Sequence, residues 1–423
     1  MSKITTLRGM NDLPPEEVRV WNFAEDTIQK VFNSYGYEEI RFPIVEKTEL
    51  FTRSNESADV VTKEMYTFED KGGDSISLRP EGTAGCVRAA IDNDLIRVDS
   101  PRLWYQGPMF RYERPQKGRS RQFQQSSAEV FGIRSAEIDA ELIILSSRIW
   151  KELGVETKLN LEINNLGDEK TRNSYAKSLQ DYFKDFKNDL DEDSLRKLDE
   201  NPLRILDSKS ESVQSLLNDA PDISDFISKD SEKEFKELTL LLNSAGIEFT
   251  INQRLVRGLD YYNQTVYEWK TDQLGAQDTV CGGGRYDNLV EELGGKPCPA
   301  TGFSIGMERL ILLIKDNLEL NLGNKNIDIF FVCLSKESIQ KAIMYSESLR
   351  EKVSKLGIRI NMGLEGAGSQ FKKADKSGAM FAFILGDDEL KNNTISMKDL
   401  RSKSDQETLS YKDLEKRIKE TYK

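Results

Sequence analysis

Two runs of alternating apolar and polar positions, residues 103–112 and 122–131, stand close together in the first third of the chain. Alternation with a period of two is typical of strands with one buried face, and a short polar segment separates the runs. The pattern predicts an antiparallel hairpin whose long tip covers residues 114–120.

Helical periodicity marks the segments on either side of this hairpin. Apolar positions recur at helical spacing in residues 16–35, before Gly36, and in residues 135–154. Residues 39–45 resemble a strand with Pro43 in its middle, and because proline donates no hydrogen bond we expect that strand at a sheet edge. Residues 301–314 join a strand to an apolar helix. The other predicted strands cover residues 66–70 and 75–78, paired as a hairpin, and residues 158–164, 248–253 and 265–269.

The second half of the chain divides by composition. Residues 167–245 hold helical patterns dense in Asp, Glu, Lys and Ser, which predicts a mainly helical insertion. Residues 316–326 are polar and predict a linker. Beyond them we expect strands at 327–334, 358–362, 379–385 and 394–398 and helices at 336–356, 370–377 and 411–422. The pattern predicts an α/β domain over residues 327–423, separate from the part of the chain before the linker.

Composition excludes several classes of protein. No apolar run approaches the length of a membrane span, and the start of the chain has no apolar signal core, so we expect a cytoplasmic protein without a membrane partner. The four cysteines form no CxxC pair, which gives no support for disulfides or zinc. The chain has no histidine at all, and this excludes imidazole catalysis and histidine-ligated metals.

Charge is reversed in the predicted hairpin. The whole chain has a net charge of -12, whereas residues 102–121 hold one anion, Glu113, and six cations. These cations are Arg102, Arg111, Arg114, Lys117, Arg119 and Arg121. Guanidinium groups bind two phosphate oxygens at once, so the tip predicts a phosphate site. The alternative is an edge hairpin that arginines keep soluble. Cations also outnumber anions in residues 325–423, which makes that region a second candidate contact for RNA.

Three further segments place polar side chains beside glycine. Glu81 and Thr83 flank a glycine in residues 78–84, where they either face a pocket or begin a helix. Arg257 lies in residues 254–262, which are too polar for a core strand and could also be a surface turn. Arg309 falls in the first turn of a predicted helix, where the helix dipole disfavours a cation, so we expect it to serve a ligand.

Together these segments resemble the histidyl-tRNA synthetase family of the class II aminoacyl-tRNA synthetases. Residues 107–119 resemble its motif 2, with Phe110, Arg111, Tyr112 and Glu113 at the centre. The other similar segments are residues 16–45 (motif 1), 301–310 (motif 3), and 254–262 and 281–287 (the histidine-specific signatures). The resemblance implies an α+β class II catalytic domain built on an antiparallel sheet over residues 1–320, a C-terminal anticodon-binding domain over residues 327–423, and a homodimer.

The resemblance also implies an activity and its substrates. Members activate L-histidine with ATP, which Mg²⁺ accompanies, and transfer it to the 3' end of tRNA(His); no zinc is expected. Arg257 and Arg111 would be catalytic. The implied ATP contacts are Arg111, Glu113, Arg119, Phe123 and Arg309, and the implied histidine contacts are Glu81, Thr83, Gln125, Glu129, Tyr262 and Tyr286. Arg114 and Gln116 would contact the tRNA acceptor end.

Two features leave other functions open. Gln124 stands where the family usually has histidine, and residues 126–128 also depart from its pattern. A regulatory paralogue that activates ATP phosphoribosyltransferase resembles the same catalytic domain, although it typically lacks the anticodon domain and degrades the Arg257 segment. A non-catalytic RNA-binding module is the third hypothesis.

Overall fold

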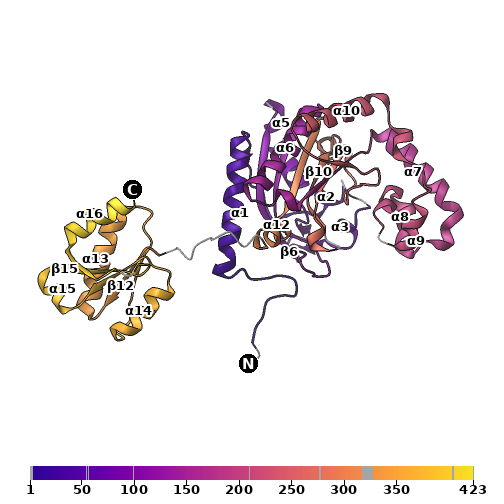
Figure 1. Ribbon diagram of the computed structural model, residues 1–423. Helices are drawn as coiled ribbons and strands as arrows, with labels where there is room; N and C mark the ends of the chain where they lie inside the picture. The colour runs from indigo at the N-terminus through magenta and orange to yellow at the C-terminus, as the bar shows by residue number, and fades with distance from the viewer. Residues whose placement is uncertain are drawn as a thin grey trace. The chain divides into compact units, whose positions relative to one another are not determined.

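The computed structural model describes residues 3–53, 55, 57–98, 100–208, 210–275, 278–316, 327–402 and 404–422. The chain forms two compact units, Met1–Leu320 and Asn321–Lys423 (Figure 1). Of the predicted linker at residues 316–326, only Asp316 lies within the described residues. No helix among the described residues is both long enough and apolar enough to cross a membrane.

An eight-stranded sheet forms the centre of the first unit. Its order is β1 (Glu38–Glu39), β5 (Arg102–Phe110), β6 (Gln122–Phe131), β11 (Ala300–Gly306), β10 (Thr279–Arg285), β9 (Asn263–Lys270), β7 (Asn160–Asn165) and β8 (Thr250–Ile251). Neighbours from β5 to β7 are antiparallel, and the two edge strands run parallel to their partners. The predicted antiparallel sheet and its central hairpin are confirmed.

Four helices share an apolar core with this sheet. They are α1 (Pro15–Ser34), α6 (Ala136–Glu152), α10 (Lys229–Ser244) and α12 (Met307–Lys315). Each buries one stripe, as helical spacing of apolar positions dictates: Ile28 and Phe32 from α1 belong to the same buried cluster as Ile143 and Trp150 from α6. Helix α10 contributes Leu238 to the same core and packs on α6, although its residues fall inside the polar region 167–245.

The remaining helices of region 167–245 gather to one side of the sheet (Figure 1). They are α7 (Glu169–Phe183), α8 (Glu192–Glu200), α9 (Glu211–Leu216) and short 3-10 turns at Lys184–Asp189, Pro202–Asp207 and Ile223–Phe226. Tyr175, Leu179 and Phe183 form the buried stripe of α7. Charged positions cover the exposed faces, which explains the polar composition. The helical character of this region is confirmed.

The predicted strand at residues 39–45 is wrong as a single element. The chain forms β1 at the edge of the large sheet and then β2 (Val45–Lys47), an edge strand of a separate sheet. Pro43 lies in the irregular stretch between them. Because proline has no N–H and restricts the residue before it, the ladder stops there and the chain changes sheets. The second sheet has the order β2, β4 (Ser75–Leu78), β3 (Tyr66–Glu69), which confirms the predicted hairpin of its last two strands.

Short helices complete the first unit. They are α2 (Thr48–Thr52), α3 (Asp59–Thr62), α4 (Thr83–Asp92), α5 (Leu95–Val98) and α11 (Leu289–Glu292), with 3-10 turns at Glu156–Lys158 and Asp272–Leu274.

The second unit is an α/β domain around one five-stranded sheet. Its order is β13 (Ile358–Ile360), β12 (Ile329–Cys333), β14 (Phe381–Leu385), β15 (Thr394–Asp399) and β16 (Glu407–Ser410). The helices are α13 (Lys336–Lys352), α14 (Ala367–Lys376), α15 (Asp387–Asn392) and α16 (Tyr411–Thr421). The predicted α/β domain is confirmed, and the sequence interpretation omitted α15 and β16.

Candidate active site

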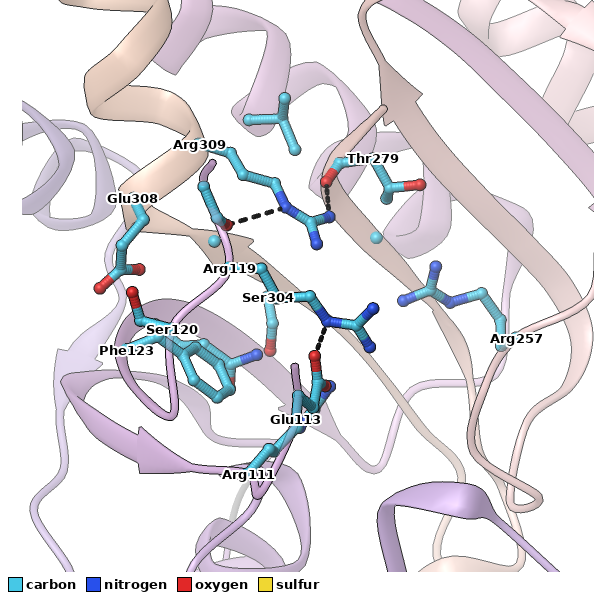
Figure 2. Close-up of a pocket in the computed structure, with 15 residues that line it drawn as sticks. Arg111, Glu113, Arg119, Ser120, Phe123, Arg257, Thr279, Ser304, Glu308 and Arg309 are labelled. Atoms are coloured by element: carbon cyan, nitrogen blue, oxygen red, sulfur yellow. Dashed lines mark hydrogen bonds and ion pairs between the residues drawn. The ribbon is translucent and has the colours of Figure 1, made fainter. Parts of the chain in front are cut away.

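A cavity of about 190 Å³ opens between the tip of the β5–β6 hairpin, strand β10 and the start of α12. Figure 2 shows guanidinium groups approaching this cavity from several sides. The residues that line it are Arg111, Glu113, Gly118, Arg119, Ser120, Phe123, Gln125, Arg257, Thr279, Val280, Gly282, Ser304, Gly306, Glu308 and Arg309. The structure therefore brings together all five residues of the implied ATP set with Arg257 and Gln125.

The hairpin supplies two of the arginines. Arg111 donates from Nε to the carbonyl oxygen of Pro80 at 2.8 Å, and its guanidinium lies 5.2 Å from the centre of the Phe123 ring. Arg119 forms an ion pair with Glu113, whose side chain is buried. Burial lowers the pKa of both arginines, but each stays far above neutral pH as a guanidinium. Both charges are therefore present in the cavity.

Arg309 crosses from the first turn of α12 to the opposite wall. Its guanidinium donates to the carbonyl oxygens of Thr279 and of Gly118, the second at 3.4 Å from Nε. Gly118 has φ +72° and lies against the Arg309 side chain, so a glycine suits the turn at this place. The contact joins the hairpin tip to the helix, and Arg309 lines the cavity.

Arg257 reaches the cavity across strand β10, which contains three consecutive glycines. A Cβ atom on Gly282 would lie 2.3 Å from Nη2 of Arg257, and one on Gly283 would lie 2.4 Å from a backbone oxygen of β11. The triple glycine therefore belongs to β10, and two of its members make room for a guanidinium and for a neighbouring strand. Arg257 forms an ion pair with Glu268 on β9. Burial lowers the pKa of Arg257, but Glu268 outweighs it and the net direction is upward.

A buried carboxyl group, Glu129, lies at the centre of a hydrogen-bonded cluster. Tyr105 and Thr83 donate to its Oε1 at 2.9 Å each, and Tyr286 donates to its Oε2 at 2.5 Å. Burial raises the pKa of Glu129 to about 8, although the three donors act in the opposite direction. Gly302 lies opposite Glu129 in the β6–β11 register, and a Cβ there would collide with the carboxyl group.

Tyrosine rings connect this cluster to Arg257. The Tyr262 ring centre is 6.5 Å from that of Tyr286 and 5.5 Å from the Arg257 guanidinium, and the tilted Tyr261 ring is centred 4.8 Å from Tyr262. The Glu129 cluster, with its residues of the implied histidine set, therefore adjoins the arginine-lined cavity, and the two form one site.

The segment with Glu81 and Thr83 is the start of helix α4. Glu81 accepts from the backbone N–H groups of Thr83 at 2.5 Å and Ala84 at 2.9 Å, so the helix-start alternative describes the backbone. Both side chains are also buried beside Glu129, and burial raises the pKa of Glu81. The two interpretations of the sequence are compatible at this place.

Asp260 anchors the loop that carries Arg257. Its carboxylate accepts from the Ser57 hydroxyl at 2.8 Å and from Nδ2 of Asn201 at 2.9 Å, and its backbone N–H donates to Asn55. Arg204 donates to the carbonyl oxygen of Ser57. The loop is therefore held by residues from the helical region 167–245 and from the segment before α3.

Other expected site residues lie elsewhere. Arg114 and Gln116 are exposed on the hairpin tip and do not line the cavity. Gln124 also stays out of the lining, as alternation from Gln125 requires, and its backbone N–H donates to Glu308 at 2.9 Å. Ser127 shares a hydrogen bond of 2.8 Å with Ser304, so the departures from the family pattern pack within the sheet.

The sequence interpretation missed several residues of the site. Glu268, Thr279 and Glu308 all contact the arginines or line the cavity, and Tyr105 contacts Glu129. A signal existed only for Glu268, a lone acid between aromatic residues in a predicted strand. Within the described ranges, no group of three or more Asp, Glu or Cys side chains is placed to hold a metal ion.

Comparisons with known proteins identify the family of this chain. The profile of the family described as histidyl-tRNA synthetase matches residues 9–310, and that of an anticodon binding domain matches residues 328–421. The structure of apo histidyl-tRNA synthetase from S. aureus is 33% identical with a TM-score of 0.82, and the match covers 99% of this chain and 100% of that one.

Two more distant structures share the fold. Histidyl-tRNA synthetase from Nostoc sp. PCC 7120 is 24% identical, with a TM-score of 0.69 and full coverage of both chains. A protein from Bacillus halodurans C described as an ATP phosphoribosyltransferase regulatory subunit/histidyl-tRNA synthetase is 20% identical, with a TM-score of 0.63 over 88% of this chain and 97% of that one. On the family match and the S. aureus structure, this chain belongs to the histidyl-tRNA synthetase family, of the bacterial type.

Proposed function

We propose that the protein activates L-histidine with ATP and transfers the histidyl group to the 3' end of tRNA(His). The observation that carries the proposal is the convergence of four guanidinium groups on one cavity that adjoins the buried Glu129 cluster. The first part suits a triphosphate, and the second suits a small polar side chain that both donates and accepts hydrogen bonds.

Activation is an in-line attack by the histidine carboxylate on the α-phosphorus of ATP. A carboxylate O–P bond forms, the bond to the β-phosphate oxygen breaks, and pyrophosphate leaves with the electron pair. The nucleophile is already an anion, so no general base is required and the absence of histidine side chains is no obstacle. The barrier depends on positioning and on stabilising charge at the phosphate.

The lining residues divide this work. Arg111 and Arg257 would stabilise the α-phosphate and the attacking carboxylate, since both guanidinium groups face the same cavity. Phe123 and Arg309 offer flat surfaces to the adenine ring, Glu113 an acceptor for its amino group, and Arg119 a cation for the outer phosphates. Mg²⁺ would enter on ATP, and the lining fits it because Glu308 adds a carboxylate of the oxygen type that Mg²⁺ prefers.

The buried cluster would read the histidine side chain. Glu129 and Tyr262 would bind the two ring nitrogens, with Tyr286 lining the pocket. Glu81, Thr83 and Gln125 would hold the α-amino group; Oε1 of Gln125 is buried and has no hydrogen-bond partner among the described residues. A site built on such polar contacts rejects apolar analogues by roughly 10⁴-fold, so specificity needs no editing domain.

The rest of the chain would serve the tRNA. Arg114 and Gln116, exposed on the hairpin tip, would contact its acceptor end, and the domain at residues 327–423 would bind its anticodon. We further propose that the protein acts in the cytoplasm as a homodimer, as the family resemblance implies.

The test is ATP/pyrophosphate exchange with each of the twenty amino acids, without tRNA. We expect exchange with histidine only, and a loss of at least about 10²-fold in Arg257→Ala, as for removal of one electrophilic donor. Arg148→Ala is the matched control, because Arg148 is half exposed on α6, and it should leave exchange unchanged. Folded wild-type protein without exchange would contradict the proposal and favour the regulatory alternative.

A further inference from the structure

Glu268 on β9 makes three contacts around Arg257. Its Oε1 pairs with Nη1 of Arg257, while its Oε2 accepts from the Thr279 hydroxyl at 2.9 Å and lies 3.5 Å from Nζ of Lys270. The carboxylate is 12% exposed and the Arg257 side chain 17%. Both oxygens are therefore engaged, and the pair is largely removed from water.

The sheet fixes where this carboxylate points. Glu268 pairs with Gly282 in the β9–β10 register, so the guanidinium lies over a neighbouring position that has no side chain. The register shifts between Thr279 and Cys281, and such an irregularity re-aims the side chains beside it. As a result Thr279 donates its hydroxyl to Glu268 while its carbonyl oxygen accepts from Arg309.

Arg257 needs a partner because its surroundings are cationic. Arg111, Arg119 and Arg309 line the same cavity, and Arg257 itself helps to lower the pKa of Arg111. Like charges in a partly buried space repel, so an unsupported guanidinium would turn away from the cavity. Glu268 lines an adjoining groove and not the cavity, and it therefore holds Arg257 from the side away from the proposed ATP site.

We propose that Glu268, supported by the Thr279 hydroxyl, is the positioning residue of Arg257: it fixes the guanidinium so that the remaining N–H groups face the reacting carboxylate and α-phosphate. The inference rests on the proposed function. Glu268 touches no substrate and acts only through Arg257. Its loss therefore weakens transition-state stabilisation, and ground-state binding of histidine, which depends on Glu129 and the tyrosines, is preserved.

The decisive variant is Glu268→Gln, which keeps the shape and removes the charge. We expect kcat of histidine-dependent exchange to fall by about 10- to 100-fold, since a misplacement of about 1 Å costs that much, with KM for histidine within about 3-fold of wild type. Thr279→Val removes one hydrogen bond and leaves the ion pair, so it should lower kcat by a few fold, and it tests the inference even where Glu268→Gln does not fold.

Glu162→Gln is the matched control. Glu162 on β7 pairs with Glu268 in the sheet register and lies 2.9 Å from the same Lys270, and its other side-chain partner among the described residues is Asn252, not Arg257. The same change of carboxylate to amide at this neighbouring position should leave kcat within about 2-fold of wild type. An equal loss in both variants would mean a general effect on the sheet and would overturn the inference.

A double-mutant cycle separates positioning from a merely structural role. In the Arg257→Ala background, Glu268→Gln should have no further effect on kcat, because the residue through which it acts is absent. Independent losses that multiply would overturn the inference, as would wild-type kcat in Glu268→Gln. Absence of exchange in the wild type is a different result, since it contradicts the proposed function itself.

Discussion

The carboxyl group of Glu129 makes the stability of the first unit depend on pH in a predictable way. Burial raises its pKa from 4.5 to about 8. Between these values the folded protein holds a proton that the unfolded chain releases, so stability is fully present below pH 4.5 and falls as pH rises to 8. At about 1.4 kcal/mol per unit, the wild type loses about 3 to 4 kcal/mol from this group between pH 5 and pH 8.

Glu129→Gln removes the titrating group and retains its shape. The free energy of unfolding of the variant, relative to wild type, should therefore rise by about 3 to 4 kcal/mol from pH 5 to pH 8. Urea denaturation followed by tryptophan fluorescence measures this. All four tryptophans, Trp21, Trp104, Trp150 and Trp269, lie in the unit Met1–Leu320, so the signal reports that unit alone. The relative midpoint should shift on the order of 1 M urea.

A matched control is available on the surface. Glu69 is exposed on β3, and Glu69→Gln should leave the free energy of unfolding within about 0.5 kcal/mol of wild type. If the stabilities of Glu129→Gln and wild type run parallel from pH 5 to pH 8, the carboxyl group is ionised throughout, and the reasoning about its burial is refuted.

Two further predictions concern neighbouring parts of the sheet. Gly282→Ala should lower kcat of exchange by at least about 10-fold with little loss of stability, because its Cβ displaces the flexible Arg257 side chain. Gly283→Ala should lower the midpoint temperature of thermal unfolding, because its Cβ meets backbone, and equal midpoints for the two variants would contradict this. Asp139→Asn removes the carboxylate charge 2.8 Å from buried Arg285 and leaves Asp287, at 3.3 Å, as its other acidic partner. It should cost about 2 kcal/mol in urea unfolding, while a cost below about 1 kcal/mol would show that the pair is dispensable.

Helices and strands whose apolar positions recur with a clear period could be predicted from the sequence. The β5–β6 hairpin, helix α12 and most of the C-terminal domain follow from alternation or helical spacing over a sufficient length. Strand β10 could not be predicted, because three glycines carry no hydrophobic pattern. Strand β16 is short and exposed, so its residues also lack the buried alternation on which the prediction depends.

Some residues of the candidate site could be predicted from the sequence, and the contacts between them could not. Arg111, Arg257 and Arg309 stand in short segments whose polarity is unusual for their predicted elements, and the structure places all three at the cavity. The contacts that complete the site join residues far apart in the chain, such as Thr83 with Glu129. Such contacts depend on sheet register and helix packing, which one sequence without relatives does not specify.

The charge of the cavity resolves an apparent conflict between an acidic chain and an anionic substrate. Four guanidinium groups line the cavity together with two carboxyl groups, those of Glu113 and Glu308. Glu113 pairs with Arg119 and also lies 3.9 Å from Arg111. The cavity therefore keeps positive charge although the chain has a net charge of -12. Screening limits the repulsion from distant carboxylates to roughly 8 to 10 Å in physiological salt, so a triphosphate at the cavity responds mainly to these nearby arginines. A local excess of guanidinium groups over carboxyl groups would thus let a strongly acidic protein hold the proposed ATP substrate.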